Sequence, residues 1–239
     1  MSDRVKQRKA AARVVREQLA RERRRQRTLW VSVAAVAVLV IAGMVGWAVL
    51  ASQDSDGFTA PKGVAAGDDT GVPTGNGPIK VDLYGDFICP ACKAWEEANG
   101  AAIDDALAAK KITLVFHPVA FLDRASSTEY STRSSAASGC AAEGGKFKEF
   151  ADALYQNQPP EGGAGLSDDE LIRIGGTVGL ADPDFAECVR DGTYKSWTAH
   201  VTEAASARGV TGTPTIYVNG KEIERTPEAF AAAIGSPTS

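Results

Sequence analysis

At 239 residues with 44% hydrophobic content, the chain can bury one sizeable core and carry additional segments. Its net charge of −4 is unevenly distributed, because residues 1–27 hold eleven Lys or Arg and three Asp or Glu, which leaves −12 on the remainder. A basic tail can bind nucleic acid, but the apolar segment after it explains the charge more simply, so we expect no nucleic-acid partner.

Residues 29–50 contain no charged residue and, as a helix, would span about 33 Å, the thickness of a bilayer core. The positive-inside rule places residues 1–28 in the cytoplasm as a basic tail and exports the rest. A cleaved signal peptide ending near Ala51 is the alternative, but its apolar region would usually be shorter. We therefore expect a single-pass cell-membrane protein with an extracytoplasmic body, where disulfides persist.

Residues 51–77 are rich in Gly, Asp, Thr and Pro and are expected to form a flexible linker. The folded domain is expected at 78–239, with β-α-β order first, a helical insertion at about 122–209, and then two strands and a helix. A capping box at Ser167–Glu170 and a hairpin signal at Asn219-Gly220 support this order. The expected strands are 79–84, 112–116, 215–218 and 222–224, and the expected helices are 90–110, 134–157, 167–178, 183–192, 194–208 and 227–234.

The sequence Cys89-Pro90-Ala91-Cys92 lies where the first strand meets the first helix. Two thiols at this spacing form a reversible disulfide or bind a metal, and export favours the redox interpretation. The positive end of the helix dipole lowers the pKa of a thiol at the helix start. We expect Cys89 to be the exposed, nucleophilic thiol and Cys92 to be the shielded, resolving one.

Together with Gly85-Asp86-Phe87, the helical insertion and Gly212-Thr213-Pro214-Thr215, this pair resembles the DsbA-like family of bacterial thiol:disulfide oxidoreductases over about residues 78–237. The resemblance implies an α/β, thioredoxin-like fold with an inserted helical subdomain. It also implies that Pro214 is a cis-proline facing the cysteines, and that the backbone of Thr213 binds substrate peptides. We expect no cofactor.

Two positions depart from the family's oxidase archetype: Ala91 replaces a histidine that stabilises the thiolate, and Leu83 replaces a buried glutamate. Asp82 is adjacent, but in a regular strand it points to the opposite face. Pro90 and Ala91 lie between the cysteines, and Asp86 and Trp95 flank them. These four are candidate tuning residues, and turn capping and core packing are the alternative roles of Asp86 and Trp95.

Cys140 and Cys188 are both expected to face the interior of the helical insertion. A structural disulfide between them is favoured and would add roughly 4 kcal/mol. Two free buried thiols, or a zinc site made by all four cysteines, remain alternatives. His117 and His200 are expected to be structural or surface residues rather than catalytic ones.

The sequence therefore predicts an enzyme, a protein thiol:disulfide oxidoreductase that oxidises exported proteins through Cys89 and Cys92. The resemblance implies a membrane redox partner that reduces quinone. A reductase or isomerase with the same chemistry is the first alternative. A non-catalytic binding module is the second, and a buried Cys89 would favour it.

Overall fold

The computed structural model describes residues 57–64 and 69–235. The expected basic tail, the expected membrane helix at 29–50, and residues 51–56 lie outside this part of the chain. Among the described residues, no helix is both long and apolar enough to cross a membrane.

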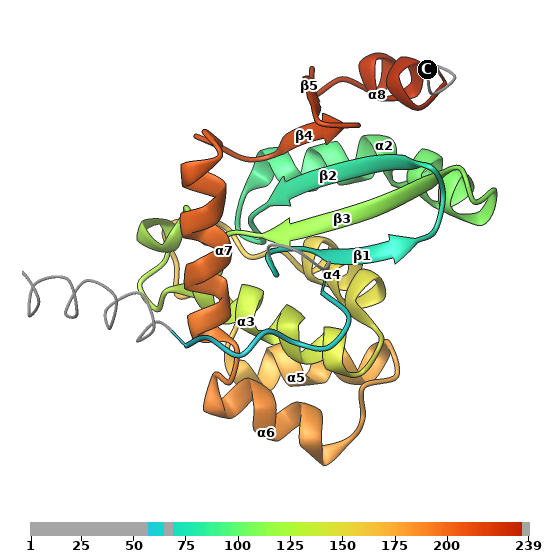
Figure 1. Cartoon of the computed structure of the whole chain (residues 1–239). Coiled ribbons are helices and arrows are strands. Elements are labelled where there is room, and N and C mark those ends of the chain that lie inside the picture. Colours follow the sequence, from blue (N-terminus) through green and yellow to red (C-terminus); the bar gives the residue numbers. More distant parts are fainter. Residues whose placement is uncertain (1–56, 65–68, 236–239) are drawn as a thin grey trace, which may run out of the picture. The chain divides into compact units, whose positions relative to one another are not determined.

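The core of the domain is a five-stranded mixed sheet in the order β1-β3-β2-β4-β5 (Figure 1). The central strands β2 and β3 are parallel, with Leu83 opposite Phe116, and the other neighbouring strands are antiparallel. Four strands match the expected positions closely. The strands are β1 (Val72–Gly75), β2 (Ile79–Gly85), β3 (Ile112–Pro118), β4 (Thr215–Val218) and β5 (Lys221–Ile223).

The fifth strand, β1, was not predicted, and it places ordered structure inside the expected linker 51–77. It pairs with β3, with Val72 opposite Phe116, so the folded domain begins before the expected residue 78. The segment Val72–Gly75 has four residues and includes Pro73, which is too short for a period-two pattern. Proline is tolerated here because the strand lies at an edge of the sheet.

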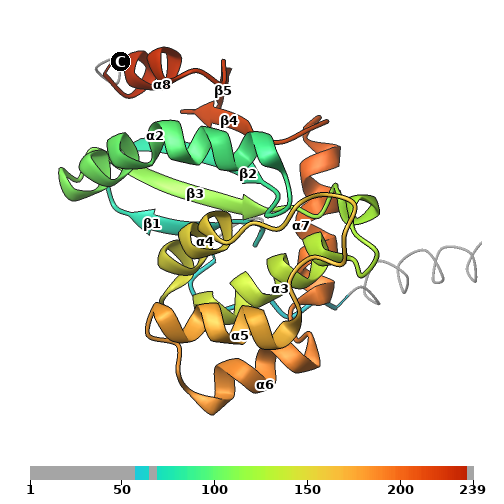
Figure 2. The ribbon, with the colours of Figure 1, turned by 180° about the vertical axis from the view of Figure 1, so that it is seen from behind.

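Helices α2 and α8 lie next to each other, and the view from behind shows α2 crossing the sheet (Figure 2). Helices α3 to α7 form the insertion between β3 and β4. The expected thioredoxin-like arrangement with a helical insertion is therefore present. The helices are α2 (Pro90–Ala108), η1 (Asp123–Ala125, a 3-10 turn), α3 (Tyr130–Glu143), α4 (Phe147–Gln156), α5 (Asp168–Thr177), α6 (Pro183–Asp191), α7 (Lys195–Ala207) and α8 (Pro227–Gly235).

The single helix expected over 134–157 is wrong, because the chain forms two helices there. Gly144 caps α3, and Gly145 adopts a φ of 67°, a left-handed conformation that costs glycine little. A Cβ at Gly144 would lie 2.4 Å from the Leu180 side chain, so close packing also requires glycine there. Two adjacent glycines therefore turn the chain between α3 and α4.

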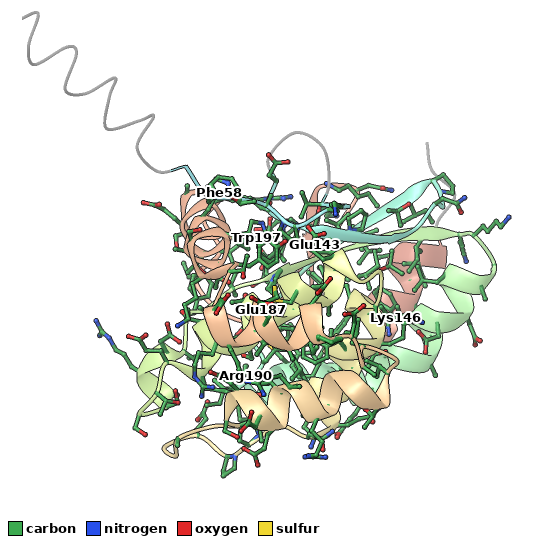
Figure 3. All side chains as sticks on the ribbon, turned by 90° about the horizontal axis from the view of Figure 1, so that it is seen from below. Phe58, Glu143, Lys146, Glu187, Arg190 and Trp197 are labelled. Carbon is green, nitrogen blue, oxygen red and sulfur yellow. A yellow bond between two sulfur atoms is a disulfide. The ribbon has the colours of Figure 1, made fainter. Side chains whose placement is uncertain are left out.

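Three described residues before β1, Phe58, Lys62 and Asp69, contact the insertion. The ring of Phe58 stacks on His200 of α7 with centroids 3.9 Å apart, and Trp197 donates its indole N–H to the Asp69 carbonyl at 2.7 Å. Figure 3 shows Phe58 and Trp197 beside α7. Lys62 binds Glu143 through both its backbone N–H (2.9 Å) and its ammonium group (3.0 Å). This part of the expected linker is therefore held by specific contacts.

Candidate functional site

The cysteine pair lies at the carboxyl end of β2, where the loop Asp86–Ile88 leads into α2. Cys89 is the N-cap of α2, and Pro90 occupies the first turn, where its missing N–H leaves no unmet hydrogen bond. The Cys89 N–H bonds the Asp86 carbonyl at 3.1 Å. This geometry aims the unpaired N–H groups of the helix start at the first sulfur.

Both thiols are free and buried: Cys89 is 5% exposed and Cys92 is 3% exposed. The expectation of an exposed Cys89 is therefore wrong. The Cys89 sulfur lies 3.5 Å from the carbonyl oxygen of Thr213, and the loop that carries Thr213 covers the Cys89 side chain. Exposure alone does not distinguish the two cysteines.

Their electrostatic surroundings do distinguish them. A hydrogen bond from the Cys92 thiol is the main cause that lowers the pKa of Cys89 to about 5, and the hydroxyl of Thr213 and the N–H groups of Cys92 and Ala91 add to it. Burial raises the pKa of Cys92 well above its ordinary value, and the Cys89 thiolate reinforces this. At neutral pH, Cys89 is therefore a thiolate and Cys92 a thiol, the state that thiol exchange requires.

The peptide bond between Thr213 and Pro214 is cis, as the family resemblance implied. As a neutral thiol, Cys89 donates to the carbonyl of Thr213, and as a thiolate it accepts from the hydroxyl of Thr213. The cis bend thus faces Cys89 directly. In the described structure, the Thr213 carbonyl is engaged by Cys89 and is available to a peptide only after the thiol turns away or ionises.

Asp86 is fully buried below the cysteine loop. Its carboxylate accepts hydrogen bonds from the N–H of Ile88 (3.1 Å), the N–H of Leu122 (3.0 Å) and the hydroxyl of Ser131 (2.7 Å). Burial, with a smaller contribution from the nearby Cys89 thiolate, nevertheless raises the pKa of Asp86 to about 6. Asp86 is therefore a carboxyl that changes its charge near neutral pH, next to the reactive sulfur.

The remaining tuning candidates differ in position. Pro90 and Ala91 are exposed on the first turn of α2. Trp95 is buried and meets Phe230 of α8 edge to face at 5.6 Å, which is core packing. Its indole nitrogen has no hydrogen-bond partner among the described atoms.

Asp82 points to the face of the sheet opposite to that of Leu83, as expected for adjacent residues of a regular strand. It bonds His117 at 3.2 Å and Lys80 at 3.0 Å. Burial alone would raise the pKa of Asp82, but these bonds hold it below its ordinary value. His117 also bonds Thr70 at 3.1 Å, so its contacts are structural, and His200 stacks on Phe58.

Gln158 and Ser131 contact the cysteine loop and were not identified from the sequence. Gln158 follows α4, and its amide donates to the carbonyls of Phe87 (3.0 Å) and Cys89 (2.9 Å). One signal was available: Gln158 precedes Pro159, which restricts it to extended conformations that project the side chain. Ser131 lies 45 residues from Asp86 and has no comparable signal.

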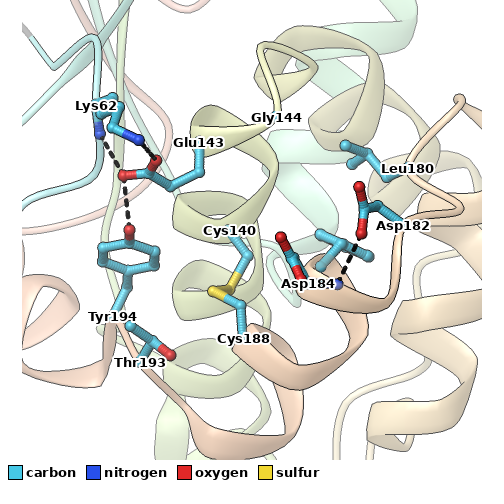
Figure 4. A pocket seen from close by; sticks show the side chains of 11 residues that line it. Lys62, Cys140, Glu143, Gly144, Leu180, Asp182, Asp184, Cys188, Thr193 and Tyr194 are labelled. Atoms are coloured by element: carbon cyan, nitrogen blue, oxygen red, sulfur yellow. Dashed lines mark hydrogen bonds and ion pairs between the residues drawn. A yellow bond between two sulfur atoms is a disulfide. The ribbon is translucent and has the colours of Figure 1, made fainter.

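Cys140 and Cys188 form the disulfide that the sequence analysis favoured, between α3 and α6 (S–S 2.03 Å). It borders a cavity of about 520 Å³ that Glu143, Asp182 and Asp184 also line (Figure 4). The bond excludes two free thiols and a zinc site made by all four cysteines. No cluster of three or more His, Cys, Asp or Glu suited to a metal occurs within residues 57–64 and 69–235.

Comparisons with known proteins agree with this arrangement. A family model described as thioredoxin matches residues 70–236. The chain is 31% identical over 170 residues to the serine/threonine-protein kinase PknE of Mycobacterium tuberculosis, which covers 66% of this chain. The chain spans only 30% of the length of that kinase.

Two solved structures from the same organism are similar over most of their length. The reduced form of the disulfide bond oxidoreductase DsbG is 31% identical, with a TM-score of 0.63 over 71% of this chain and 88% of that one. Reduced DsbA is 30% identical, with a TM-score of 0.62 over 70% of this chain and 91% of that one.

Proposed function

Because the chain belongs to the DsbA-like thiol-disulfide oxidoreductases of the thioredoxin family, we propose that its Cys89–Cys92 pair oxidises the cysteines of exported proteins. The observation that carries this proposal is the opposite shift of the two thiol pKa values, to about 5 for Cys89 and well above 9 for Cys92. A stabilised Cys89 thiolate favours the reduced pair, which makes the corresponding disulfide an oxidant.

The reaction begins with the oxidised pair. A substrate thiolate attacks the sulfur of Cys89, a mixed disulfide forms, the Cys89–Cys92 bond breaks, and Cys92 leaves as a thiolate that takes up a proton. A second substrate thiolate then attacks the substrate sulfur of the mixed disulfide and releases Cys89 as a thiolate. The substrate loses two electrons in forming its disulfide, and the cysteine pair gains them. The backbone of Thr213, beside Pro214, holds the substrate peptide by strand addition.

We assign to Asp86 the role of giving and accepting the proton in these steps. The Cys92 thiolate is a poor leaving group because its pKa is high, so a proton donor near the cysteine pair assists the first step. The backbone N–H of Asp86 bonds the sulfur of Cys92, and its buried carboxyl has a pKa of about 6. A group with this pKa both gives and accepts a proton near neutral pH.

The proposal extends to location and partners. Residues 29–50 anchor the chain in the cell membrane, residues 1–28 stay in the cytoplasm, and the catalytic domain faces outward. The clients are exported proteins with cysteine thiols. A membrane partner that reduces quinone accepts the electrons of the reduced pair, and shared anchoring raises the effective concentration of the two proteins.

A reductase or isomerase is the second candidate, and Ala91 is the observation that favours it. The exposed first turn carries no histidine to add to the stabilisation of the Cys89 thiolate. The two directions differ only in reduction potential. A non-catalytic binding module is consistent with the burial of Cys89 but not with a Cys89 pKa of about 5.

Trapping tests the proposal in the native membrane. Cys92→Ala removes the resolving thiol, so mixed disulfides at Cys89 accumulate and can be identified by mass spectrometry; Cys89→Ala is the matched control. Recovery of exported clients together with a membrane oxidase supports oxidation. Recovery of a reducing electron donor alone contradicts it, and failure of Cys89 to react with iodoacetamide at pH 6 contradicts any exchange function.

A further inference from the structure

Gln158 joins the helical insertion to the loop that carries the first cysteine. It lies two residues beyond the end of α4, about 70 residues along the chain from that loop. Its amide nitrogen donates to the carbonyls of Phe87 at 3.0 Å and of Cys89 at 2.9 Å. Both carbonyl oxygens can only accept hydrogen bonds, so the NH₂ group of Gln158, and not its amide oxygen, must face them.

The Cys89 carbonyl receives three donors. Besides Gln158, the N–H groups of Cys92 (3.1 Å) and Lys93 (3.2 Å) bond it as the first hydrogen bonds of α2. The N–H of Cys92 also donates to the sulfur of Cys89 and helps to lower the pKa of that thiol. One N–H is therefore shared between the carbonyl and the sulfur of the same residue.

A carbonyl oxygen has two lone pairs, and its demand for donors decreases as others satisfy it. Gln158 supplies two N–H groups to the carbonyls next to the sulfur, where uncompensated carbonyl dipoles would repel a thiolate. Without Gln158, the Cys92 N–H would bond the Cys89 carbonyl more strongly and the sulfur less strongly.

We propose that Gln158 is a positioning residue that satisfies the Phe87 and Cys89 carbonyls and thereby leaves the start of α2 free to stabilise the Cys89 thiolate. This inference rests on the proposed exchange function and adds a residue from the helical insertion to its control. Gln158 does not touch the reacting atoms and acts through the backbone of Cys89.

The anchoring of Gln158 supports this role. Its backbone N–H bonds the Tyr155 carbonyl at 3.2 Å, and the buried ring of Tyr155 packs against Phe87 with centroids 5.3 Å apart. Pro159 restricts the backbone of Gln158 further. The amide is therefore held in place before a substrate arrives, which makes its hydrogen bonds less costly in conformational entropy.

The test compares full-length variants at position 158. Gln158→Met keeps the length and removes the donors, Gln158→Lys keeps a donor with similar reach, and Gln158→Asn is one methylene too short. Gln156→Met, at an exposed position at the end of α4, is the matched control. The readouts are the pH midpoint of Cys89 alkylation by iodoacetamide and the equilibrium constant for exchange with glutathione.

Gln158→Met and Gln158→Asn should raise the midpoint and shift the glutathione equilibrium about three- to tenfold toward the disulfide, because each lost hydrogen bond contributes modestly. The Gln158→Lys variant should have the wild-type alkylation midpoint or a lower one. Lower thermal stability with an unchanged midpoint and equilibrium in both the Met and Asn variants would overturn the proposal, since that result means a purely structural role. A wild-type Cys89 that titrates like a free cysteine would instead overturn the proposed function.

Discussion

Two thiols on one helical turn differ in charge at neutral pH because their hydrogen-bond partners differ. Cys89 is at the open start of α2 and receives donors, whereas Cys92 is one turn inside and donates to Cys89. The pKa of Cys89 falls from 9.0 to about 5 on folding, so its thiolate stabilises the reduced fold fully above pH 9. This stabilisation decreases as the pH falls toward 5.

The stability contributed by Asp86 depends on pH with the opposite sign to that of Cys89. Burial raises its pKa from 3.8 to about 6, so its contribution to folding is full below pH 4 and declines as the pH rises through 6. Asparagine does not ionise. The stability of the reduced wild type minus that of Asp86→Asn should therefore fall by about 2 kcal/mol between pH 4 and pH 7.

Urea unfolding at several pH values measures this difference. Asp105→Asn, at an exposed carboxyl on α2, is the matched control. A difference for Asp86→Asn that stays constant or grows with pH would contradict the buried-carboxyl account.

Single-residue roles were predictable where the signal is local. The cysteine pair and Thr213-Pro214 are short motifs whose conformation depends on adjacent residues. Gln158 and Ser131 act on the cysteine loop from far along the chain, so only the packing of the insertion brings them there. The burial of Cys89 was missed for the same reason, because the covering loop at Thr213 follows it by 124 residues.

At the scale of elements, side-chain caps begin α5 and α6. Ser167 accepts from the Glu170 N–H at 3.3 Å, and the Glu170 carboxylate accepts from the Ser167 N–H at 2.7 Å, which completes the predicted capping box of α5. Ser167→Ala should lower the free energy of unfolding by about 1 kcal/mol. Chemical denaturation measures this loss, and Ser206→Ala, at an exposed position inside α7, should show none. Equal stabilities for the two variants would mean that the cap contributes nothing.

Most elements were predictable because their boundaries carry turn chemistry. Asn219 and Gly220 both adopt positive φ, at 49° and 81°, as the expected hairpin turn requires. The break between α3 and α4 was missed although Gly144 and Gly145 mark it, because apolar spacing continues across both helices. Strand β1 was missed because an edge strand of four residues has no periodic pattern of its own.

At the scale of the whole molecule, the Cys140–Cys188 disulfide ties α3 to α6 across 48 residues. In the chain-entropy model, replacing both cysteines by alanine should lower the free energy of unfolding by about 4 kcal/mol. The alkylation midpoint of Cys89 should not change. Denaturation and alkylation of the double variant check both outcomes, and a shifted midpoint would show that the disulfide also controls the redox pair.

The central claim is that the Cys89–Cys92 disulfide oxidises other thiols, and its reduction potential tests this most directly. Equilibration of the full-length protein with glutathione buffers, followed by quantification of the reduced and oxidised pair, gives the value. A thiolate stabilised at a pKa of about 5 predicts a potential closer to about −120 mV, as in strong oxidants, than to about −270 mV. A value near −270 mV or below would contradict the claim and identify a reductase.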